Sequence, residues 1–437
     1  MPPASSPFLI AAEKCGLFSP DRLSQLLTST EPADRLAEQL VQSGELTQFQ
    51  ADKLRAGFWQ GLCLGSYRVL VPIGRGGMGV VYLAAQGETN AGARYAIKIL
   101  PPRLARNEPR KRERFYREMR IGSSLAAHRH ITRTHEGGEI NGVHYLTMEY
   151  VPGTTLRKYV QDHGPLDAGF ATMIGAGLAD GLAHLHAAKV VHRDFKPSNV
   201  MLTPGHDAKI LDFGFAMVLG ESLPADPRIV GGQGYVLGTM DYIAPEQIEN
   251  AVAVTPASDL YSLGCTLFFA LTGSPPYPGG DAQQKLRWHR TSEPPDVRTI
   301  MPTVPEELAR LVSQLVRRDA DRRPQSAAEV RDRLRAISGM EREPVESIDI
   351  EQDVEILTHQ KVGEDVINKP IFLDDEDDDD ESDGSGIIDA VEEKIRRQQG
   401  WTDPEAAPLY WYLIAGLVFL IVLFLSALLF IAMRNPA

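Results

Sequence analysis

Cysteine is scarce in this chain of 437 residues. Only Cys15, Cys63 and Cys265 occur, far apart and without a CxxC pair. Neither a disulfide framework nor a cysteine zinc site is expected, and the pattern is typical of a reducing compartment. The first residues also lack a basic stretch followed by a long apolar run, so we expect no secretory signal peptide.

A basic patch with interleaved aromatic residues is also lacking, so no role in nucleic-acid binding is expected. The net charge is −13, but the acidic residues are unevenly distributed, because residues 341–400 hold 21 acidic and 6 basic residues. We predict an acidic, disordered linker at 338–408, since its charges repel one another and its most acidic part has little to bury. A solvated spacer is the simpler interpretation. A tether that competes for basic surfaces or binds cations stays open.

Long apolar runs are absent until the C-terminal end. Residues 413–433 are 21 consecutive residues without a charge, enough for a helix to span a hydrocarbon core of about 30 Å. Tyr410, Trp411 and Tyr412 precede this run as an aromatic interface belt. The sequence predicts one transmembrane helix at 409–433 and a short extracytoplasmic tail at 434–437. The run has no GxxxG pattern that would indicate dimerisation through this helix.

Four functional side chains lie close together in VVHRDFKPSN, residues 190–199. The string resembles the catalytic loop of eukaryotic-type protein kinases, and a lysine two residues after the aspartate is typical of the serine/threonine enzymes. The resemblance implies that Asp194 accepts the proton of an acceptor hydroxyl, that Lys196 stabilises the transferred phosphoryl group and that Asn199 binds a metal ion. It also implies that Arg193 faces an activation segment.

A glycine-rich stretch upstream, IGRGGMGVVYLA, allows backbone amides to approach phosphate oxygens, because glycine has no Cβ. The apolar segment YAIK follows and ends in Lys98, which the resemblance places on the α- and β-phosphates of ATP. The next helical stretch offers Glu118 as the partner of Lys98, with Glu113 as the competing choice. The family implies these nucleotide-binding residues: Ile73, Gly74, Arg75, Gly76, Gly77, Met78, Gly79, Val81, Ala96, Lys98, Glu149, Val151 and Met201.

Three further motifs follow in the order that the family has them. KILDFGFA contains Asp212, the second implied metal ligand. GTMDYIAPE contains Thr239, which in the family hydrogen-bonds near the catalytic aspartate, and Glu246, which in the family pairs with a late arginine, here Arg323. Asp259 matches the aspartate that braces the catalytic loop. Seven ordered matches make a chance resemblance very rare.

Hydroxyl groups are few between the metal-binding DFG motif and the APE motif. Only Ser222, Tyr235, Thr239 and Tyr242 occur there, and glycines stand where related bacterial kinases usually carry threonines. We therefore expect regulation by phosphorylation of this segment to be weak or to use Ser222.

Several histidines lie near the expected site, but their spacing suits no zinc site, and we interpret them as structural. They are His128, His130, His135, His184, His186 and His192.

Residues 1–62 show apolar residues at three- and four-residue spacings, which predicts helices, with Thr47 as an N-cap. The strings GELTQFQADKL and GLCLGSYRVL resemble a segment found ahead of bacterial kinases from planctomycete-like lineages. Two interpretations stay open: a docking or regulatory module, and a helical pair that buttresses the small lobe, which we slightly prefer.

The motifs together predict a bilobal α+β protein kinase fold at 67–337, with a β-rich N-lobe and a helical C-lobe. The resemblance implies a Hanks-type bacterial serine/threonine kinase that phosphorylates proteins and uses ATP with Mg²⁺ or Mn²⁺. Because ATP is cytosolic, we expect a single-pass inner-membrane protein whose kinase domain faces the cytoplasm. A homodimer and a regulator that binds residues 1–62 stay open.

Two alternatives belong to other classes. A membrane-anchored pseudokinase scaffold predicts the loss of Lys98, Asp194, Asn199 or Asp212, and all four are present. A small-molecule kinase would lack the GT and APE elements that form a peptide groove, and both elements are present.

Overall fold

The computed structural model describes residues 6–76, 79–221, 240–252 and 254–338, with short pieces between 354 and 371. All of these belong to the first of two compact units of the chain, residues 1–387. The second unit, residues 388–437, lies outside the described residues, and the predicted membrane helix and tail lie in it. In the part of the chain that is described, no helix combines the length and the apolar character needed to cross a bilayer.

The N-terminal segment is helical, as the sequence predicts. Its helices are α1 (Pro7–Lys14), α2 (Pro20–Thr28), α3 (Ala33–Gln42) and α4 (Gln48–Arg55). Ser6 and Ser19 cap α1 and α2 by accepting hydrogen bonds from backbone amides. Thr47 and Gln50 form a capping box at α4, in which each side chain bonds the backbone amide of the other residue. These caps satisfy amides that a helix start leaves without partners.

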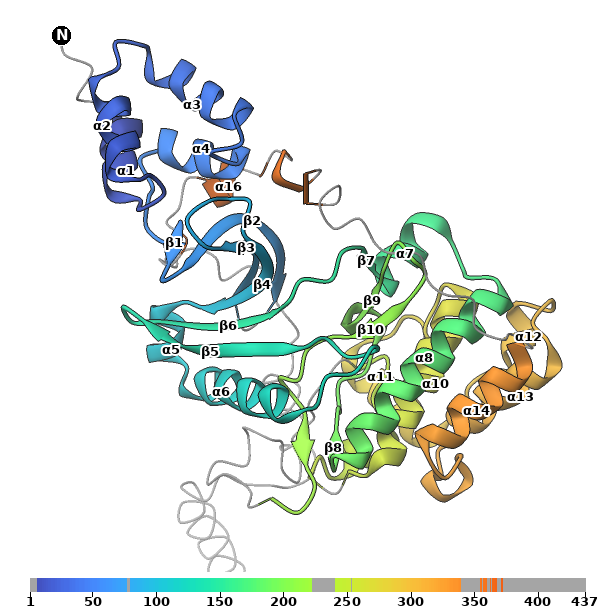
Figure 1. Ribbon diagram of the computed structural model, residues 1–437. Helices are drawn as coiled ribbons and strands as arrows, with labels where there is room; N and C mark the ends of the chain where they lie inside the picture. Colours follow the sequence, from blue (N-terminus) through green and yellow to red (C-terminus); the bar gives the residue numbers. More distant parts are fainter. Residues whose placement is uncertain are drawn as a thin grey trace, which may run out of the picture. The chain divides into compact units, whose positions relative to one another are not determined.

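A six-stranded antiparallel sheet forms the small lobe, in the order β1-β2-β3-β4-β6-β5 (Figure 1). The strands are β1 (Cys63–Leu64), β2 (Tyr67–Gly76), β3 (Gly79–Gln86), β4 (Ala93–Leu100), β5 (Thr134–Ile140) and β6 (Val143–Glu149). Between β4 and β5 the chain forms α5 (Pro102–Asn107) and α6 (Pro109–Ser124), and α6 packs against β5. The sheet and α6 therefore hold the residues of the expected nucleotide site.

The large lobe is mostly helical and is built around α8 (Ala168–Ala187) and α10 (Pro256–Thr272), which contact each other. Every α10 residue from Ser258 to Leu271 is buried. The other helices are α7 (Leu156–His163), η2 (Pro197–Asn199), α9 (Pro245–Glu249), α11 (Ala282–Thr291), α12 (Val297–Ile300), α13 (Glu306–Leu315), η4 (Ala320–Arg322) and α14 (Ala327–Ser338). Its short strands are β7 (Thr154–Thr155), β8 (Val190–Val191), β9 (Val200–Leu202), β10 (Ala208–Ile210) and β11 (Met217–Val218). The predicted two-lobed α+β architecture is confirmed.

The N-terminal helices share one apolar core with the sheet of the small lobe. Phe49 and Leu54 of α4 are completely buried in the same cluster as Val69 and Leu83 of the sheet. Side chains also bond the strand backbone, since Thr47 Oγ1 donates to the Leu70 carbonyl at 2.7 Å. The helices therefore form part of the small lobe.

The chain beyond α14 contributes to this core as well. Val354 and Ile371 are buried in the cluster that holds the N-terminal helices, and the short helix α16 (Glu364–Ile367) contacts α4. We call the described residues between Val354 and Ile371 the strap. The linker expected at 338–408 is thus not solvated throughout, because its apolar residues pack here. The acidic run 374–381 lies outside the described residues.

A buried histidine in the large lobe generates a prediction about acid stability. His289 on α11 is 1% exposed, its Nδ1 lies 2.7 Å from the hydroxyl of Tyr261, and burial lowers its pKa to about 4. An unfolded histidine titrates near 6.5, so protons favour the unfolded chain between pH 6.5 and 4. We expect the free energy of unfolding to fall by about 3 kcal/mol over this window because of His289 alone.

Urea unfolding of His289→Gln at pH 6.5, 5 and 4 checks this expectation, because the variant should lose less stability with acid than the wild type. The exposed His206 supplies the control, since His206→Gln should keep the full acid loss. An equal acid loss in His289→Gln and in the wild type would contradict the assignment.

Candidate active site

Lys98 and Glu118 form a buried ion pair between β4 and α6. The Lys98 Nζ atom lies 2.7 and 3.0 Å from the two carboxylate oxygens of Glu118. Glu118 is 1% exposed, whereas Glu113, the competing choice, lies on the exposed side of the same helix. Glu118 is therefore the acid that reaches Lys98.

Asp212 is a second carboxylate partner of Lys98, with Oδ2 at 3.5 Å from Nζ. Burial disfavours the charged lysine, but Asp212 and Glu118 outweigh it and raise the pKa of Lys98. Burial likewise opposes ionisation of Asp212, yet Lys98 and the Gly214 amide lower its pKa. Burial, together with Asp212, raises the pKa of Glu118 to about 7. Two carboxylates thus share one ammonium group, which is an arrangement that a further cation would stabilise.

The backbone conformation at Asp212 directs the carboxylate toward Lys98. The φ of Asp212 is +60°, in the left-handed region that non-glycine residues rarely adopt. The Gly214 amide donates to Asp212 Oδ1 at 2.8 Å and supports this turn. Strained backbone of this kind costs about 1–3 kcal/mol and persists where surrounding contacts enforce it.

The catalytic loop brings Asp194, Lys196 and Asn199 together around one carboxylate. Lys196 Nζ lies 2.7 Å from Asp194 Oδ2. Asn199 Nδ2 donates to the Asp194 carbonyl at 2.9 Å and to Asp194 Oδ2 at 3.2 Å. Asp194 is mostly buried, at 8% exposed. Its carboxylate is therefore held in one orientation by neighbours from its own loop.

Asp259, on α10, fixes the backbone at the start of this loop. Its carboxylate accepts hydrogen bonds from the backbone amides of His192 and Arg193, both at 2.9 Å. It also lies 2.8 Å from His186 Nε2. Arg193 itself has a φ of +67°. Burial opposes ionisation of Asp259, but the hydrogen bond from His186 and the nearby histidine charges keep its pKa low. An ionised, fully buried acid thus holds a strained loop.

Asp212 and Asn199 are the residues that could hold Mg²⁺. Both side chains offer oxygen atoms, which Mg²⁺ prefers. They come from adjoining backbone, since the Leu211 amide donates to the Asn199 carbonyl at 2.9 Å. Among the described residues, no group of three or more His, Cys, Asp or Glu side chains could hold a metal alone. A Mg²⁺ ion held by Asp212 and Asn199 would therefore draw its remaining ligands from phosphate oxygens and water.

The glycine-rich stretch lies where β2 meets β3. Gly76 pairs with Gly79, and Gly79 has a φ of +135° with a Cβ position only 2.0 Å from the Ile99 carbonyl oxygen. Only glycine fits there. Gly77 and Met78 lie outside the described residues.

The residues implied to contact the nucleotide base come from both lobes. Val81 pairs with Lys98 across β3 and β4, and Ala96 pairs with Leu83 in the same ladder. Val151 is buried just after β6, and Met201 on β9 is half-buried. Glu149, at the end of β6, bonds Lys209 Nζ at 2.8 Å, so its side chain ties β6 to the large lobe. Two more of the implied nucleotide-binding residues lie on β2, where Ile73 is half-buried and Gly74 is exposed. Arg75 also belongs to β2, but its side chain is not described.

Arg117 links α6 to the segment after Asp212, a role that sequence reasoning missed. Its side chain is buried, Nε donates to the Ala216 carbonyl at 3.0 Å, and Nη2 pairs with Glu221. The sequence offers no signal for this residue, because it is one of many arginines on a basic helix. In the fold, the Arg117 side chain points to Ala216 and Glu221 and is shielded from solvent.

The activation segment is only partly described. Ser222 and Thr239 lie outside the described residues, so the roles predicted for them stay predictions. Arg193 is 2% exposed, and burial, with Arg117 nearby, lowers its pKa to about 9. A buried guanidinium beside a second one favours an anion from the adjoining segment.

Glu246 and Arg323 form the ion pair that the resemblance implies. The contacts are bidentate, at 2.7 and 2.9 Å, and Arg323 also lies over the ring of Tyr261 at 4.9 Å. The pair joins α9 to the chain between η4 and α14, and Arg323 also donates to the carbonyl of Ala257 in α10 at 2.8 Å.

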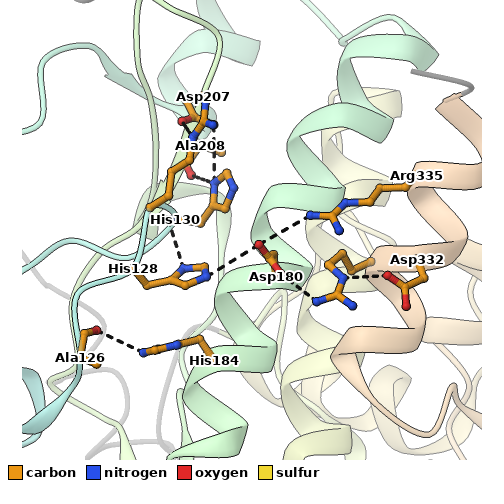
Figure 2. A network of polar contacts seen from close by, with 11 residues as sticks. Ala126, His128, His130, Asp180, His184, Asp207, Ala208, Asp332 and Arg335 are labelled. Carbon is orange, nitrogen blue, oxygen red and sulfur yellow. Dashed lines mark hydrogen bonds and ion pairs between the residues drawn. The ribbon is translucent and has the colours of Figure 1, made fainter. Parts of the chain in front are cut away.

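The histidines near the lobe junction form a network of hydrogen bonds and ion pairs. Figure 2 shows His128 between His130 and Asp180, with His184 bonded to the Ala126 carbonyl. The rings of His128 and His184 stack at 4.7 Å, and Asp180 lies 3.7 Å from His128 Nε2. Asp180 is also shared with Arg331 and Arg335 of α14. Burial lowers the pKa of His128, in keeping with a structural role.

Gly122 allows α6 to approach β5 closely enough for the ion pair to form. A Cβ at Gly122 would lie 2.2 Å from Oγ1 and 2.9 Å from Cβ of Thr134. Gly122 is one helical turn beyond Glu118, so the spacing at this point sets the depth at which Glu118 enters the site.

These contacts define a two-lobed fold in which the glycine-rich strand β2, the cluster of Lys98, Glu118 and Asp212, and the loop of Asp194, Lys196 and Asn199 form the candidate site. The model of the protein kinase domain family matches residues 67–333. The chain belongs to the protein kinase family.

Curated relatives support the same family. The chain is 38% identical over 277 residues to the serine/threonine-protein kinase pkn2 of Myxococcus xanthus, covering 62% of this chain and 32% of that protein. It is 32% identical over 292 residues to the serine/threonine-protein kinase PrkC of Bacillus subtilis, covering 67% of this chain and 43% of PrkC. It is 35% identical over 272 residues to the probable serine/threonine-protein kinase pknA2 of Bifidobacterium longum, covering 62% and 35%. The match thus spans less than half the length of these relatives.

The close contact at Gly122 generates a prediction. Gly122→Ala should push α6 away from β5 and lower kcat/KM about 10²-fold, because a shift of about 1 Å in a positioning group has effects of that size. Thr134→Gly in the same chain should restore part of the activity by removing the opposing side chain.

Steady-state phosphorylation assays of both variants check this. Ser123→Ala, at the exposed neighbouring position, is the control and should keep wild-type activity. If Gly122→Ala is fully active, the spacing of α6 from β5 does not control the ion pair.

Proposed function

We propose that this chain is an ATP-dependent serine/threonine protein kinase, which transfers the γ-phosphoryl group to hydroxyl groups of proteins. The observation that carries the proposal is the joint placement of Lys98, Glu118 and Asp212 on one side and of Asp194, Lys196 and Asn199 on the other. The printed names of the relatives, which are serine/threonine-protein kinases, support the same class.

The chemistry follows from the charges that these residues place around the reacting atoms. Asp194 accepts the proton of the acceptor hydroxyl as the hydroxyl oxygen bonds the γ-phosphorus. The bond between that phosphorus and the β–γ bridging oxygen breaks, and ADP leaves with the electron pair. Lys196, 2.7 Å from Asp194 Oδ2, neutralises charge on the transferred phosphoryl group. Lys98, oriented by Glu118, holds the phosphates that remain on the nucleotide. Positioning and charge neutralisation supply most of the catalysis, because the protein forms no covalent bond.

Mg²⁺, or Mn²⁺ in its place, would be held by Asp212 and Asn199 and would neutralise phosphate charge when bound. The fit is supported by the charges at Lys98, because the carboxylates of Glu118 and Asp212 carry more negative charge than one ammonium group balances. The lowered pKa of Asp212 keeps this ligand ionised at neutral pH.

The pseudokinase alternative has no observation in its favour. It requires the loss of a residue that binds nucleotide, metal or acceptor, and Lys98, Asp194, Asn199 and Asp212 are all present and oriented.

The role of Asp194 generates a direct test. Asp194→Asn should lower the rate of phosphoryl transfer about 10² to 10⁴-fold, because the acceptor hydroxyl loses its base. Transfer of radiolabelled phosphate from ATP to a basic test protein, with Mg²⁺ and with Mn²⁺, gives the rate, and phosphoamino-acid analysis identifies serine or threonine as the acceptor.

Asp162→Asn is the matched control, since Asp162 is an exposed acid on α7 whose partner is Lys158. This variant should transfer at the wild-type rate. Equal rates for the wild type and Asp194→Asn would remove Asp194 from the mechanism.

Membrane anchoring by residues 409–433, with the kinase domain on the cytoplasmic side, is part of the proposal. Its support is the run of 21 uncharged residues and the aromatic residues that precede it. Single-pass attachment to the inner membrane, a homodimer and a regulator that binds residues 1–62 belong to the same proposal.

Removal of residues 409–437 tests the anchor. We expect the full chain to stay with the membrane fraction after carbonate extraction and the shortened chain to become soluble, because the apolar run is the part that partitions into lipid. Fractionation followed by immunoblotting measures both. Recovery of the full chain in the soluble fraction would contradict the anchor.

A further inference from the structure

The strap covers α4, the N-terminal helix that packs on the sheet. Its two ends, Val354 and Ile371, are 3% and 8% exposed in the shared core. Leu357, Val362 and Val366 pack against the same cluster from between them. The strap thus follows α14 in the sequence but is buried in the small lobe.

Lys53 of α4 gives this contact a polar centre. Its side chain is 2% exposed, and Nζ donates to the carbonyl of Val366 in the last turn of α16. The ammonium also lies 5.5 Å from the ring centre of Phe49 and 5.8 Å from that of Phe58. Aromatic faces and the carbonyl end of a helix favour a cation, whereas burial opposes it and lowers the pKa of Lys53 to about 8. Lys53 therefore joins the strap to α4 with a defined partner.

The next contacts lead from α4 to β2. Thr47 donates to the Leu70 carbonyl at 2.7 Å, and Gln50 Nε2 donates to the Val69 carbonyl at 2.8 Å. Both side chains belong to the capping box that starts α4. The start of α4 is therefore fixed to the backbone of one strand of the sheet.

That strand carries the first glycines of the nucleotide site. β2 runs from Tyr67 to Gly76, with shifts in its pairing to β3 between Val69 and Val71 and between Pro72 and Gly74. The bonds at Val69 and Leu70 therefore lie on the same strand as Gly74 and Gly76. Contacts from the strap to α4 and from α4 to β2 form one continuous series of packed and hydrogen-bonded groups, which is a physical route for energetic coupling between two regions.

We propose that the strap, which consists of the described residues between Val354 and Ile371, is a clamp that holds α4 on β2 and thereby raises the affinity for ATP. The inference rests on the proposed kinase function for its nucleotide, but the clamp is tested without phosphoryl transfer. Loss of one buried valine or isoleucine contact corresponds to a factor of about 10 to 100 in an opening equilibrium.

Hydrogen–deuterium exchange of the full chain in detergent, read by mass spectrometry, tests the clamp. Val354→Asp changes a residue of the strap and no residue of the N-terminal helices. Lys53→Met keeps the length of the side chain but removes the hydrogen-bond donor. In both variants we expect amides of residues 48–55 and 67–76 to exchange about tenfold faster or more. Glu355→Gln, at an exposed strap position, is the control and should exchange as the wild type does.

Binding of ATP, measured by isothermal titration calorimetry, gives the second readout. Kd should rise about fivefold in Val354→Asp and Lys53→Met, within the range usual for coupled sites, and should not change in Glu355→Gln. Unchanged exchange in residues 48–55 would overturn the clamp. Faster exchange there with unchanged exchange in 67–76 and unchanged ATP affinity would overturn its coupling to the nucleotide site. Because neither readout needs catalysis, a failure of the kinase proposal is a separate result.

Discussion

The candidate active site depends on the contacts of the Lys98 ammonium group with two carboxylates. Glu118 binds it at 2.7 Å and Asp212 at 3.5 Å, so one atom joins β4, α6 and the segment after β10. Burial alone would drive a proton from this lysine, and only the two carboxylates keep it charged. The lobes therefore meet at a cation whose charge depends on all three segments being in place. Without it, the buried carboxylate of Glu118 and the half-buried carboxylate of Asp212 would repel each other.

Helix α6 sets the geometry of that cation through three neighbouring positions. Glu118 reaches Lys98, Arg117 holds Ala216 and Glu221 of the activation segment, and Gly122 permits the close approach to β5. Rotation of α6 about its axis would break the bonds of Glu118 or Arg117, or would separate Gly122 from Thr134. This couples the orientation of the glutamate to the start of the activation segment, since adjacent residues on one helix must move together.

The small lobe is larger than a sheet with one helix. The N-terminal helices and the strap bury their apolar residues in the core of the sheet, so segments from both ends of the kinase domain stabilise the strand that carries Gly74 and Gly76. The buttress interpretation of residues 1–62 agrees with this packing, and a regulatory role would act through the same contacts.

The sequence by itself determined the family, the two lobes and the order of the motifs, because phosphoryl transfer requires particular side chains at short, fixed spacings. Asp194, Lys196 and Asn199 lie within six residues of one another, and local backbone brings them together. It also left Glu113 and Glu118 as rivals, since both lie on the same helix. Only the tertiary structure decided for Glu118, assigned Arg117 and Gly122, and placed the strap on α4. These features depend on contacts between residues far apart in the chain, where side-chain type and spacing carry no signal. Lys53 and Val366 show the reason, because neither is unusual in its own segment until the fold brings them into contact.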